Sequence, residues 1–314
     1  MKLHHVIEAQ QFDLATLSRL FEVTQRMEQV VAQGGVGDFQ NRVMAALFYE
    51  PSTRTRFSFE AAMQRLGGRV ISTENASEFS SVAKGETLED TIRIMNGYAD
   101  VIVLRHHEMG AARRAAAVSR VPIINAGDGP GQHPTQALLD LYTIRKEIGA
   151  IDGLKIAMVG DLAQGRTVRS LAYLLSRYQG VKMYFVAPPL LRMKDDILNH
   201  LRERGVEFVE EPTMEAVLPE ADVVYQTRIQ RERFGDRLAD YEKCRGIYVL
   251  TQESLRRMRS GAIIMHPLPR LDEISMEVDA DPRAAYFRQA QNGLYVRMAL
   301  LTLLLDGTTH PRQY

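Results

Sequence analysis

The chain has 314 residues, of which 45% are apolar and 25% are charged, and its 39 basic side chains balance its 39 acidic ones. This composition excludes disordered, fibrous and small disulfide-rich proteins, and the charge balance excludes the broad positive field that attracts nucleic acid or anionic membranes. The length favours two domains, and the single cysteine, Cys244, cannot form an intramolecular disulfide. We therefore expect a cytoplasmic protein that binds neither nucleic acid nor a membrane.

The first half of the chain predicts alternating strands and helices. Asp13 precedes apolar residues at helical spacing, so it is suited to cap a helix that starts beside it. Continuous apolar runs at 43–48, 101–104 and 121–124 are typical of parallel strands that are buried on both faces. Residues 127–131, Gly-Asp-Gly-Pro-Gly, predict a tight turn, because their glycine spacing does not fit a dinucleotide-binding loop.

The second half repeats this rhythm of apolar runs and helix-like segments. The runs that predict strands lie at 156–159, 183–186, 223–225 and 262–265. We therefore expect an α/β protein of two doubly wound parallel-sheet domains, with the active site in the interdomain cleft. The predicted boundaries are 1–132 for the first domain, 133–291 for the second, and 292–314 for a C-terminal helix that returns to the first domain.

An anion site is predicted where the run at 43–48 ends in a turn rich in hydroxyl groups and arginine. Residues 50–56 have the sequence Glu-Pro-Ser-Thr-Arg-Thr-Arg and lead into a helix-like segment. Helix N-termini attract anions because their first amides lack intrahelical partners, and Ser52, Thr53 and Arg54 would add donors suited to phosphate. The alternative is that Ser52 or Thr53 only caps the helix while the two arginines lie on its solvated surface.

Three segments of the second half carry polar or conformationally restricted residues where a predicted strand ends. Residues 160–167 are similar to a nucleotide-binding loop except that arginine replaces its lysine, and a planar guanidinium favours a carboxylate over a terminal phosphate. Residues 225–233 carry several arginines, which alone are more typical of a solvated loop. Residues 266–270, His-Pro-Leu-Pro-Arg, have restricted backbones and alone favour a rigid turn at the end of a strand.

Four motifs occur in order along the chain: 52–56, Ser-Thr-Arg-Thr-Arg; 83–87, Ala-Lys-Gly-Glu-Thr; 133–136, His-Pro-Thr-Gln; and 266–270, His-Pro-Leu-Pro-Arg. Together they resemble the aspartate carbamoyltransferase catalytic chains of the aspartate/ornithine transcarbamoylase family. The resemblance implies transfer of the carbamoyl group of carbamoyl phosphate to L-aspartate, giving N-carbamoyl-L-aspartate and phosphate in de novo pyrimidine biosynthesis. It implies no metal, no cofactor and no protein nucleophile.

The resemblance also implies the residues of the site. Those implied for carbamoyl phosphate are Ser52, Thr53, Arg54, Thr55, Arg105, His133, Gln136, Pro267 and Leu268. Those implied for L-aspartate are Lys84, Arg166, Arg228 and Gln230. The implied catalytic residues are Arg54, Thr55, Arg105 and His133, whose donors would stabilise the oxyanion that forms during amine attack. Taken alone, Arg105 is equally typical of a surface charge at a strand end, and His133 of a residue at the start of a helix.

A neighbouring subunit is implied to complete the site. Ser80 and Lys84 match a mobile family loop that reaches into the active site of the next chain, which implies a homotrimer with shared active sites. Glu50, Arg166 and Arg233 match an interdomain network of ion pairs associated with closure of the cleft. The sequence leaves open whether a regulatory chain or dihydroorotase is a further partner.

Two alternatives to this function are open. One is carbamoyl transfer to another amine such as ornithine, although ornithine-specific relatives typically carry cysteine where this chain has Pro267 and have a different acceptor loop. The other is a non-catalytic subunit that binds a metabolite and retains the fold. Loss of Arg54, Thr55, Arg105 or His133 would have favoured that alternative, and all four are present.

Overall fold

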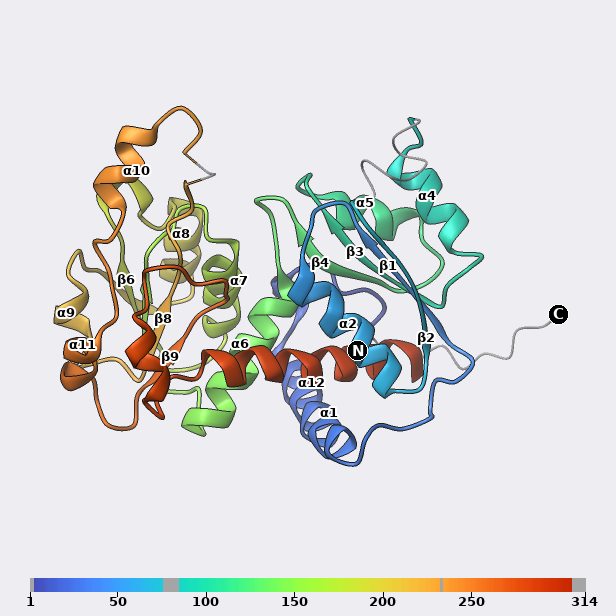
Figure 1. The fold of residues 1–314 in the computed structure, drawn as a ribbon, viewed down its shortest axis with the longest axis horizontal. Helices are drawn as coiled ribbons and strands as arrows, with labels where there is room; N and C mark the ends of the chain where they lie inside the picture. Colours follow the sequence, from blue (N-terminus) through green and yellow to red (C-terminus); the bar gives the residue numbers. More distant parts are fainter. Residues whose placement is uncertain (1–2, 76–84, 232–233, 307–314) are drawn as a thin grey trace. The chain divides into compact units, whose positions relative to one another are not determined.

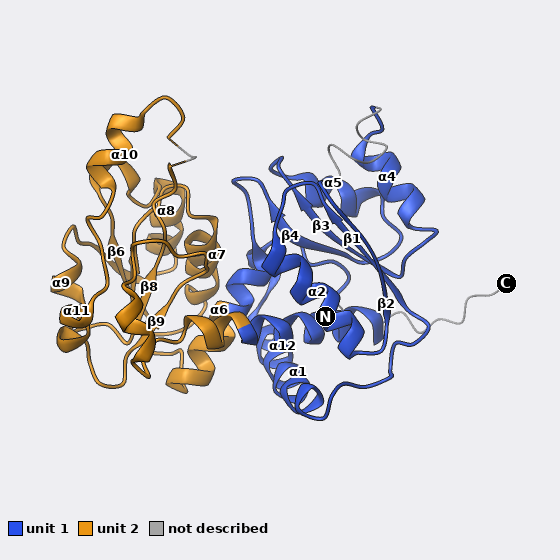
Figure 2. Ribbon diagram, viewed as in Figure 1, with its two compact units in different colours: residues 1–139, 291–314 blue, residues 140–290 orange. Residues whose placement is uncertain are grey.

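The computed structural model describes residues 3–75, 85–231 and 234–306. The chain divides into two compact units, which Figure 2 distinguishes: unit 1 comprises residues 1–139 and 291–314, and unit 2 comprises residues 140–290. Both boundaries fall inside helices, one in α6 (Pro134–Ile148) and the other in α12 (Tyr286–Leu305). The chain therefore passes from one unit to the other through helical backbone.

Unit 1 is built on a four-stranded parallel sheet with the strand order β2-β1-β3-β4 (Figure 1). Its strands are β1 (Val43–Phe48), β2 (Arg69–Glu74), β3 (Val101–His106) and β4 (Ile123–Asp128). Its helices are η1 (Ala9–Gln11), α1 (Leu14–Ala32), α2 (Thr53–Arg65), α4 (Leu88–Met95) and α5 (Ala111–Val118), with the first residues of α6 and most of α12.

The central strands of this sheet are buried on both faces. Ala45 and Leu47 of β1 pack in one apolar cluster with side chains from α4 and α5. Met44 and Ala46 alternate with them along the strand, so their side chains point to the opposite face, and both are fully buried. Burial on two faces explains why β1 is a continuous apolar run rather than an alternating one.

The helices at the two ends of the sequence also follow from local chemistry. Asp13 caps α1 as predicted, because its Oδ1 accepts a hydrogen bond of 2.7 Å from the backbone N–H of Thr16. Helix α12 includes residues 292–305 of the predicted C-terminal helix and begins earlier, at Tyr286, whereas residues 307–314 of that prediction lie outside the described residues. Within the part of the chain that the structure describes, no helix has the length and apolar character needed to cross a bilayer.

Unit 2 is built on a five-stranded parallel sheet with the strand order β7-β6-β5-β8-β9, of which Figure 1 labels β6, β8 and β9. Its strands are β5 (Lys155–Val159), β6 (Lys182–Val186), β7 (Glu207–Glu210), β8 (Val223–Gln226) and β9 (Ile263–Met265). Its helices are α7 (Arg166–Leu175), η3 (Pro189–Leu191), α8 (Asp195–Glu203), α9 (Met214–Val217), α10 (Leu238–Cys244), α11 (Gln252–Arg257) and η5 (Met276–Ala280).

The predicted α/β class with two doubly wound parallel sheets is confirmed, and every predicted apolar run overlaps an observed strand. Two strands were not predicted, β2 and β7, and each lies at the edge of its sheet. Most of their side chains are partly or fully exposed. An edge strand with little buried surface needs no continuous apolar run, so the pattern that marked the central strands is missing there.

Candidate active site

The predicted anion site of unit 1 lies where β1 leads into α2. Helix α2 begins at Thr53 with Ser52 as its N-cap, and the Ser52 side chain makes no capping hydrogen bond within the part of the chain described. The structure therefore does not support a role for Ser52 as a simple cap. Thr53 and Arg54 are exposed, Thr55 is buried, and partial desolvation lowers the pKa of the Arg54 guanidinium below its ordinary value.

Arg105 lies beside this turn, because β3 pairs with β1 and Arg105 is in register with Phe48. Its guanidinium donates a hydrogen bond of 3.1 Å to the carbonyl of Ala126 and lies 3.2 Å from a carboxylate oxygen of Glu50. Burial lowers the pKa of Arg105, and the charge of Glu50 opposes that shift. The side chain is 12% exposed. Arg105 is therefore a largely buried cation whose position is fixed by its partners, and not a surface charge at a strand end.

His133 lies at the start of α6, at the end of the segment that follows β4. Its side chain is buried, and its carbonyl accepts hydrogen bonds of 3.1 Å from Gln136 N–H and 3.2 Å from Ala137 N–H. The predicted tight turn precedes it: the N–H of Gly131 donates to the carbonyl of Asp128 over 2.9 Å. His133 thus begins the helix and also belongs to the loop that extends from the carboxyl end of the sheet.

Asp128 is a buried residue of this region that sequence analysis did not identify. One carboxylate oxygen accepts a hydrogen bond of 2.7 Å from Gln132 N–H, and the other accepts one of 2.9 Å from Gly110 N–H. It therefore joins the loop before His133 to the start of α5. No local pattern distinguishes it from an ordinary turn aspartate, because both of its partners are backbone amides.

The three candidate segments of unit 1 lie at one edge of its sheet. They follow or end β1, β3 and β4, which are adjacent parallel strands. The carboxyl ends of parallel strands meet at one edge, which is where α/β proteins usually bind ligands. The structure thereby brings the turn at 52–55 together with Arg105, and the loop before His133 leaves the same edge.

In unit 2, the segment 160–165 joins β5 to α7, and Arg166 is the first residue of that helix. Gly160 has φ +113°, and a Cβ placed on it would lie 2.6 Å from Oγ1 of Thr227 and closer still to its carbonyl oxygen. Only glycine therefore permits this approach. The side chain of Asp161 accepts a hydrogen bond of 3.0 Å from Gln164 N–H, which tightens the loop before Arg166.

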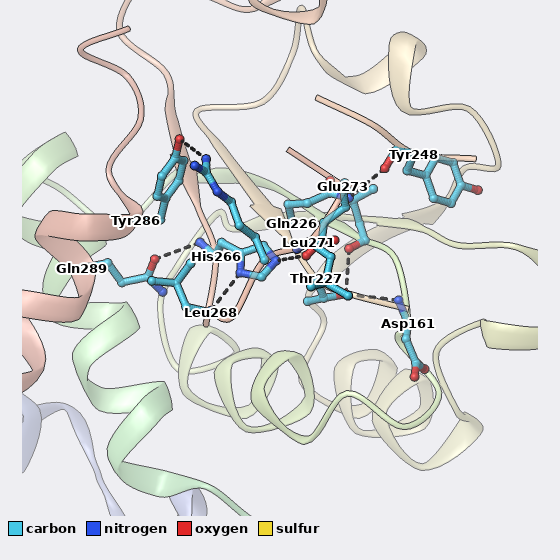
Figure 3. Close-up of polar contacts among 12 residues, drawn as sticks. Asp161, Gln226, Thr227, Tyr248, His266, Leu268, Leu271, Glu273, Tyr286 and Gln289 are labelled. Atoms are coloured by element: carbon cyan, nitrogen blue, oxygen red, sulfur yellow. Dashed lines mark hydrogen bonds and ion pairs between the residues drawn. The ribbon is translucent and has the colours of Figure 1, made fainter. Parts of the chain in front are cut away.

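Thr227 fastens the loop after β5 to the segment after β8. Its hydroxyl accepts a hydrogen bond of 3.1 Å from Asp161 N–H and donates one of 2.9 Å to the carbonyl of Val159 (Figure 3). Arg228 and Gln230 follow directly and are half-buried. The segment is therefore more ordered than a solvated loop, and sequence analysis did not predict the contribution of Thr227.

The segment after β9 holds Pro267 and Leu268, both half-buried. Leu268 has φ +49°, which is uncommon for a residue with a branched side chain. Its N–H donates a hydrogen bond of 2.8 Å to Nδ1 of His266, whose Nε2 lies 2.8 Å from Oε1 of Glu273 (Figure 3). Buried side chains therefore hold this turn in its shape, and Glu273 had no distinguishing local pattern in the sequence.

The predicted site residues divide between the two units. Unit 1 contains Ser52, Thr53, Arg54, Thr55, Arg105, His133 and Gln136, and unit 2 contains Arg166, Arg228, Gln230, Pro267 and Leu268. Ser80, Lys84 and Arg233 lie outside the described residues. Glu50, expected in an interdomain network, pairs with Arg105 inside unit 1. Each unit therefore presents its own set of polar groups.

Two domains of a known family match the chain, and each match covers one of the two sets of polar residues. Residues 4–146 match the carbamoyl-P binding domain of the aspartate/ornithine carbamoyltransferases, and residues 152–304 match their Asp/Orn binding domain. The chain belongs to the aspartate/ornithine carbamoyltransferase family. The predicted family is thus confirmed by matches that together span nearly the whole chain.

Individual relatives identify the branch of the family. Aspartate carbamoyltransferase 1, chloroplastic, of Pisum sativum is 62% identical and covers 98% of this chain and 80% of its own length. The catalytic subunit of Methanocaldococcus jannaschii aspartate transcarbamoylase has a TM-score of 0.92, 48% identity, and coverage of 98% of this chain and 100% of that chain. The Trypanosoma cruzi aspartate transcarbamoylase in complex with carbamoyl phosphate and aspartate has a TM-score of 0.91, 42% identity, and 97% coverage of each chain. These similarities confirm the predicted enzyme class and reaction, transfer of the carbamoyl group to aspartate.

The expectation of a cytoplasmic protein is wrong. Relatives from Pisum sativum, Oryza sativa and Arabidopsis thaliana, at 61% to 62% identity, are chloroplastic enzymes. The expectation rested on the single cysteine. That property does not identify a compartment, because a chain without an intramolecular disulfide is compatible with more than one of them.

Proposed function

We propose that the polar groups of unit 1 bind carbamoyl phosphate, that the carbonyls of Pro267 and Leu268 in unit 2 accept hydrogen bonds from its NH₂ group, and that Arg166, Arg228 and Gln230 of unit 2 bind L-aspartate. The reaction joins the amine nitrogen of L-aspartate to the carbamoyl carbon, breaks the bond from that carbon to the bridging oxygen, and yields N-carbamoyl-L-aspartate and phosphate. We place this step in de novo pyrimidine biosynthesis. The observation that carries the assignment is the start of α2, where an anion would meet unpaired helical amides, two threonine hydroxyls and Arg54.

The phosphate group is assigned to the turn at 52–55. The first amides of a helix lack intrahelical acceptors, and the helix dipole is positive at that end. Because Ser52 does not cap α2 within the described residues, its hydroxyl is available to the ligand rather than to the helix. Arg54 adds a charged fork, and its lowered pKa reflects desolvation that an anionic ligand would offset.

The carbamoyl carbonyl is assigned to donors from Thr55, Arg105, His133 and Gln136. Amine attack places negative charge on the carbonyl oxygen. Hydrogen-bond donors that are already in position stabilise that charge, because they need not reorganise during the reaction. Arg105 is held in this way, because Ala126 and Glu50 fix two sides of its guanidinium. One such donor typically accelerates the reaction by about 10² to 10³-fold.

L-Aspartate is assigned to Arg166, Arg228 and Gln230. Two guanidinium forks suit the two carboxylates of aspartate, and each fork can make a pair of charge-assisted hydrogen bonds. Arg166 begins α7 after β5, and Arg228 follows β8, which pairs directly with β5. Both arginines therefore leave the carboxyl end of the same sheet, fastened together by Thr227.

The chemistry requires no covalent intermediate with the protein. Cys244 is buried, and burial raises the pKa of its thiol, so it is a poor nucleophile at neutral pH. Direct attack by the amine, with both substrates held in position, supplies catalysis through proximity and charge stabilisation. The leaving phosphate, beside the amine, is the acceptor that we propose for the amine proton.

The direct test is product formation by the purified chain from carbamoyl phosphate, with L-aspartate and L-ornithine in parallel. We expect turnover with L-aspartate alone, and its loss in Arg54→Ala. Arg56→Ala is the matched control, because Arg56 lies in the same turn but pairs with Glu74 over 2.9 Å. Turnover with ornithine, or full activity of Arg54→Ala, would contradict the assignment.

We further propose that the chain forms a homotrimer whose sites are shared through Ser80 and Lys84. The support is the match of residues 83–87 to the family loop. Mixing inactive Lys84→Ala chains with inactive Arg54→Ala chains should restore activity, because some sites would then combine an intact Arg54 with an intact Lys84. Mixed trimers of verified composition that recover no activity would exclude sharing.

A further inference from the structure

Unit 2 buries a pair of polar side chains that the proposed chemistry does not use. His266 follows β9 and is 2% exposed, and Glu273 is 7% exposed. Nε2 of His266 lies 2.8 Å from Oε1 of Glu273 (Figure 3). Burial of an acid and an imidazole costs free energy unless both are fully hydrogen-bonded, so such a pair is weak evidence for stability alone.

The hydrogen bonds around the pair fix the tautomer of His266. Nδ1 accepts the N–H of Leu268 over 2.8 Å, so it carries no proton, and the ring proton lies on Nε2, from which it is donated to Glu273. Oε2 of Glu273 accepts the N–H of Leu271 over 3.1 Å. Burial raises the pKa of Glu273, but its hydrogen bonds to His266 and to backbone amides outweigh burial and leave that pKa below its ordinary value.

The backbone of His266 is also held by a hydrogen bond. Its N–H donates a hydrogen bond of 2.9 Å to the side chain of Gln289 on α12, whose amide group donates one of 2.6 Å to Asp140 on α6. The other oxygen of Asp140 accepts the hydroxyl of Tyr225 on β8 over 2.7 Å. His266, Gln289, Asp140 and Tyr225 are all at least nine-tenths buried. The position of the imidazole is therefore fixed from three elements of unit 2.

The segment that His266 holds has an unusual backbone. Leu268 has φ +49°, a left-handed conformation that residues other than glycine adopt only when their surroundings impose it. The hydrogen bond from its N–H to Nδ1 of His266 is an interaction of the Asx-turn type, with the ring nitrogen in place of a side-chain oxygen. Without an acceptor at that place, the strained conformation would lose the contact that supports it.

We propose that His266 and Glu273 are positioning residues that aim the carbonyls of Pro267 and Leu268 at the NH₂ group of carbamoyl phosphate. This inference rests on the proposed function, in which those carbonyls accept hydrogen bonds from the substrate. The NH₂ group is the only donor in the carbamoyl phosphate dianion, and inorganic phosphate has no NH₂ group. His266 and Glu273 therefore govern recognition of the carbamoyl part of the substrate and leave recognition of the phosphate part to unit 1.

Two substitutions of His266 separate its two hydrogen bonds. In His266→Asn the side-chain oxygen occupies the place of Nδ1 and can still accept the N–H of Leu268. In His266→Gln the amide reaches the place of Nε2 and contacts Glu273 but not Leu268. Glu273→Gln is a third variant, since it keeps the shape of the side chain and permits the opposite tautomer of His266. Native secondary structure and native oligomer size are confirmed for each variant before kinetics.

The measurements are KM for carbamoyl phosphate and the inhibition constant of inorganic phosphate. We expect His266→Gln and Glu273→Gln to raise KM by about tenfold, the effect of losing one buried hydrogen bond. We expect His266→Asn to raise it by less than about threefold, and the inhibition constant of phosphate to change by less than about twofold in all three variants, because no hydrogen bond to phosphate is lost. If these residues had only a structural role, the variants would weaken the binding of phosphate and of carbamoyl phosphate to the same extent.

Three results would overturn the proposal. These are equal losses in His266→Asn and His266→Gln, an inhibition constant of phosphate that rises together with KM, or a KM that no variant changes. Failure of the proposed function has a different signature, because the unmodified chain would then show no turnover, or Arg54→Ala would retain it. Either outcome would remove the positioning roles together with the function on which they rest.

Discussion

The two units present their polar groups in different ways. In unit 1, the turn at 52–55 is one continuous peptide, and its donors come from a helix N-terminus and from side chains beside it. In unit 2, Arg166, Arg228 and Leu268 follow three different strands and are fastened by buried contacts between distant segments. Substitution in unit 1 should therefore remove a contact with the substrate, whereas many substitutions in unit 2 should act by changing geometry.

The difference follows from the ligands that the units are proposed to bind. Phosphate is compact and carries its charge on several equivalent oxygens, so amides and cations clustered at one helix terminus suffice. A dicarboxylate has two separated charges and needs two forks at a fixed spacing. Thr227 helps to fix the spacing between Arg166 and Arg228, because its hydroxyl, in the segment after β8, forms hydrogen bonds with Asp161 and Val159 in and after the adjacent strand β5.

Removal of a charge in unit 1 should have the largest effect. Arg105→Ala should lower kcat by about 10² to 10³-fold, because a held donor at the developing oxyanion is lost. Arg113→Ala is the matched control, since its side chain is 69% exposed and pairs with Glu8, and it should leave kcat unchanged. Steady-state kinetics with both substrates saturating would measure the effect. Equal activity of the two variants would show that Arg105 is not a catalytic residue.

Removal of a charge in unit 2 should affect substrate binding more than turnover. Arg228→Ala should raise KM for L-aspartate by about 100-fold, because a charge-assisted fork to a carboxylate is lost, and should leave KM for carbamoyl phosphate within about twofold. Arg231→Ala is the control, because Arg231 is exposed in the same loop. A rise in KM for carbamoyl phosphate instead would break the division between the units.

A glycine substitution tests whether geometry controls unit 2. Gly160→Ala would place a Cβ against Thr227 at φ +113°, whereas Gly205→Ala would add one at φ +66° with no atom within 4 Å. Gly160→Ala should lower the free energy of unfolding by about 2 to 4 kcal/mol and Gly205→Ala by about 1 kcal/mol. Urea denaturation would measure the difference. Similar losses would show that the approach of Thr227 to Gly160 is not tight.

The smallest expected effect concerns an ion pair of unit 2 that lies outside the assigned substrate contacts. Arg270 donates to both carboxylate oxygens of Asp279, and the hydroxyl of Tyr286 also donates to that group. The hydrogen bond from Arg270, opposed by burial and aided by Tyr286, lowers the pKa of Asp279. Its contribution to stability is therefore present above the ordinary pKa of an aspartate and is lost as pH falls through the lowered value.

Asp279→Asn should consequently destabilise the chain by about 1 kcal/mol at pH 7. The difference from the unmodified chain should shrink as the pH falls below about 4. Unfolding midpoints measured between pH 7 and pH 3 would show this convergence. A difference that stays constant over that range would mean that ionisation of Asp279 does not stabilise the fold.

Sequence patterns could predict the features whose residues are neighbours in the chain. The anion site that we propose at residues 52–55 could be inferred from the sequence because its hydroxyls, its arginine and its helix start are neighbours in the chain. The buried strands, including the edge strands β4 and β9, were predictable because burial demands continuous apolar runs, whereas the side chains of the edge strands β2 and β7 are partly or fully exposed and have no such demand. The family resemblance added Arg105, His133 and the segments 225–233 and 266–270, which local chemistry could not distinguish from surface charges or turns. The loop at 160–167 was different, because its arginine in place of lysine already favoured a carboxylate.

The positioning side chains could not be predicted for a physical reason. Thr227 contacts Asp161 at a separation of 66 residues, and Asp128 contacts Gly110 at a separation of 18 residues. Glu273 is close to His266 in sequence, but only the turn after β9 brings their side chains together. A threonine or an acidic residue has no local pattern that marks a buried partner, because the partner is set by the fold.

The most direct test of the division between the units is equilibrium binding of inorganic phosphate to the unmodified chain, Arg54→Ala and Arg228→Ala, measured by calorimetry. We expect Arg54→Ala to weaken phosphate binding by at least about tenfold and Arg228→Ala to retain it within about twofold. Retained binding in Arg54→Ala, or an equal loss in Arg228→Ala, would contradict the assignment of the phosphate group to unit 1.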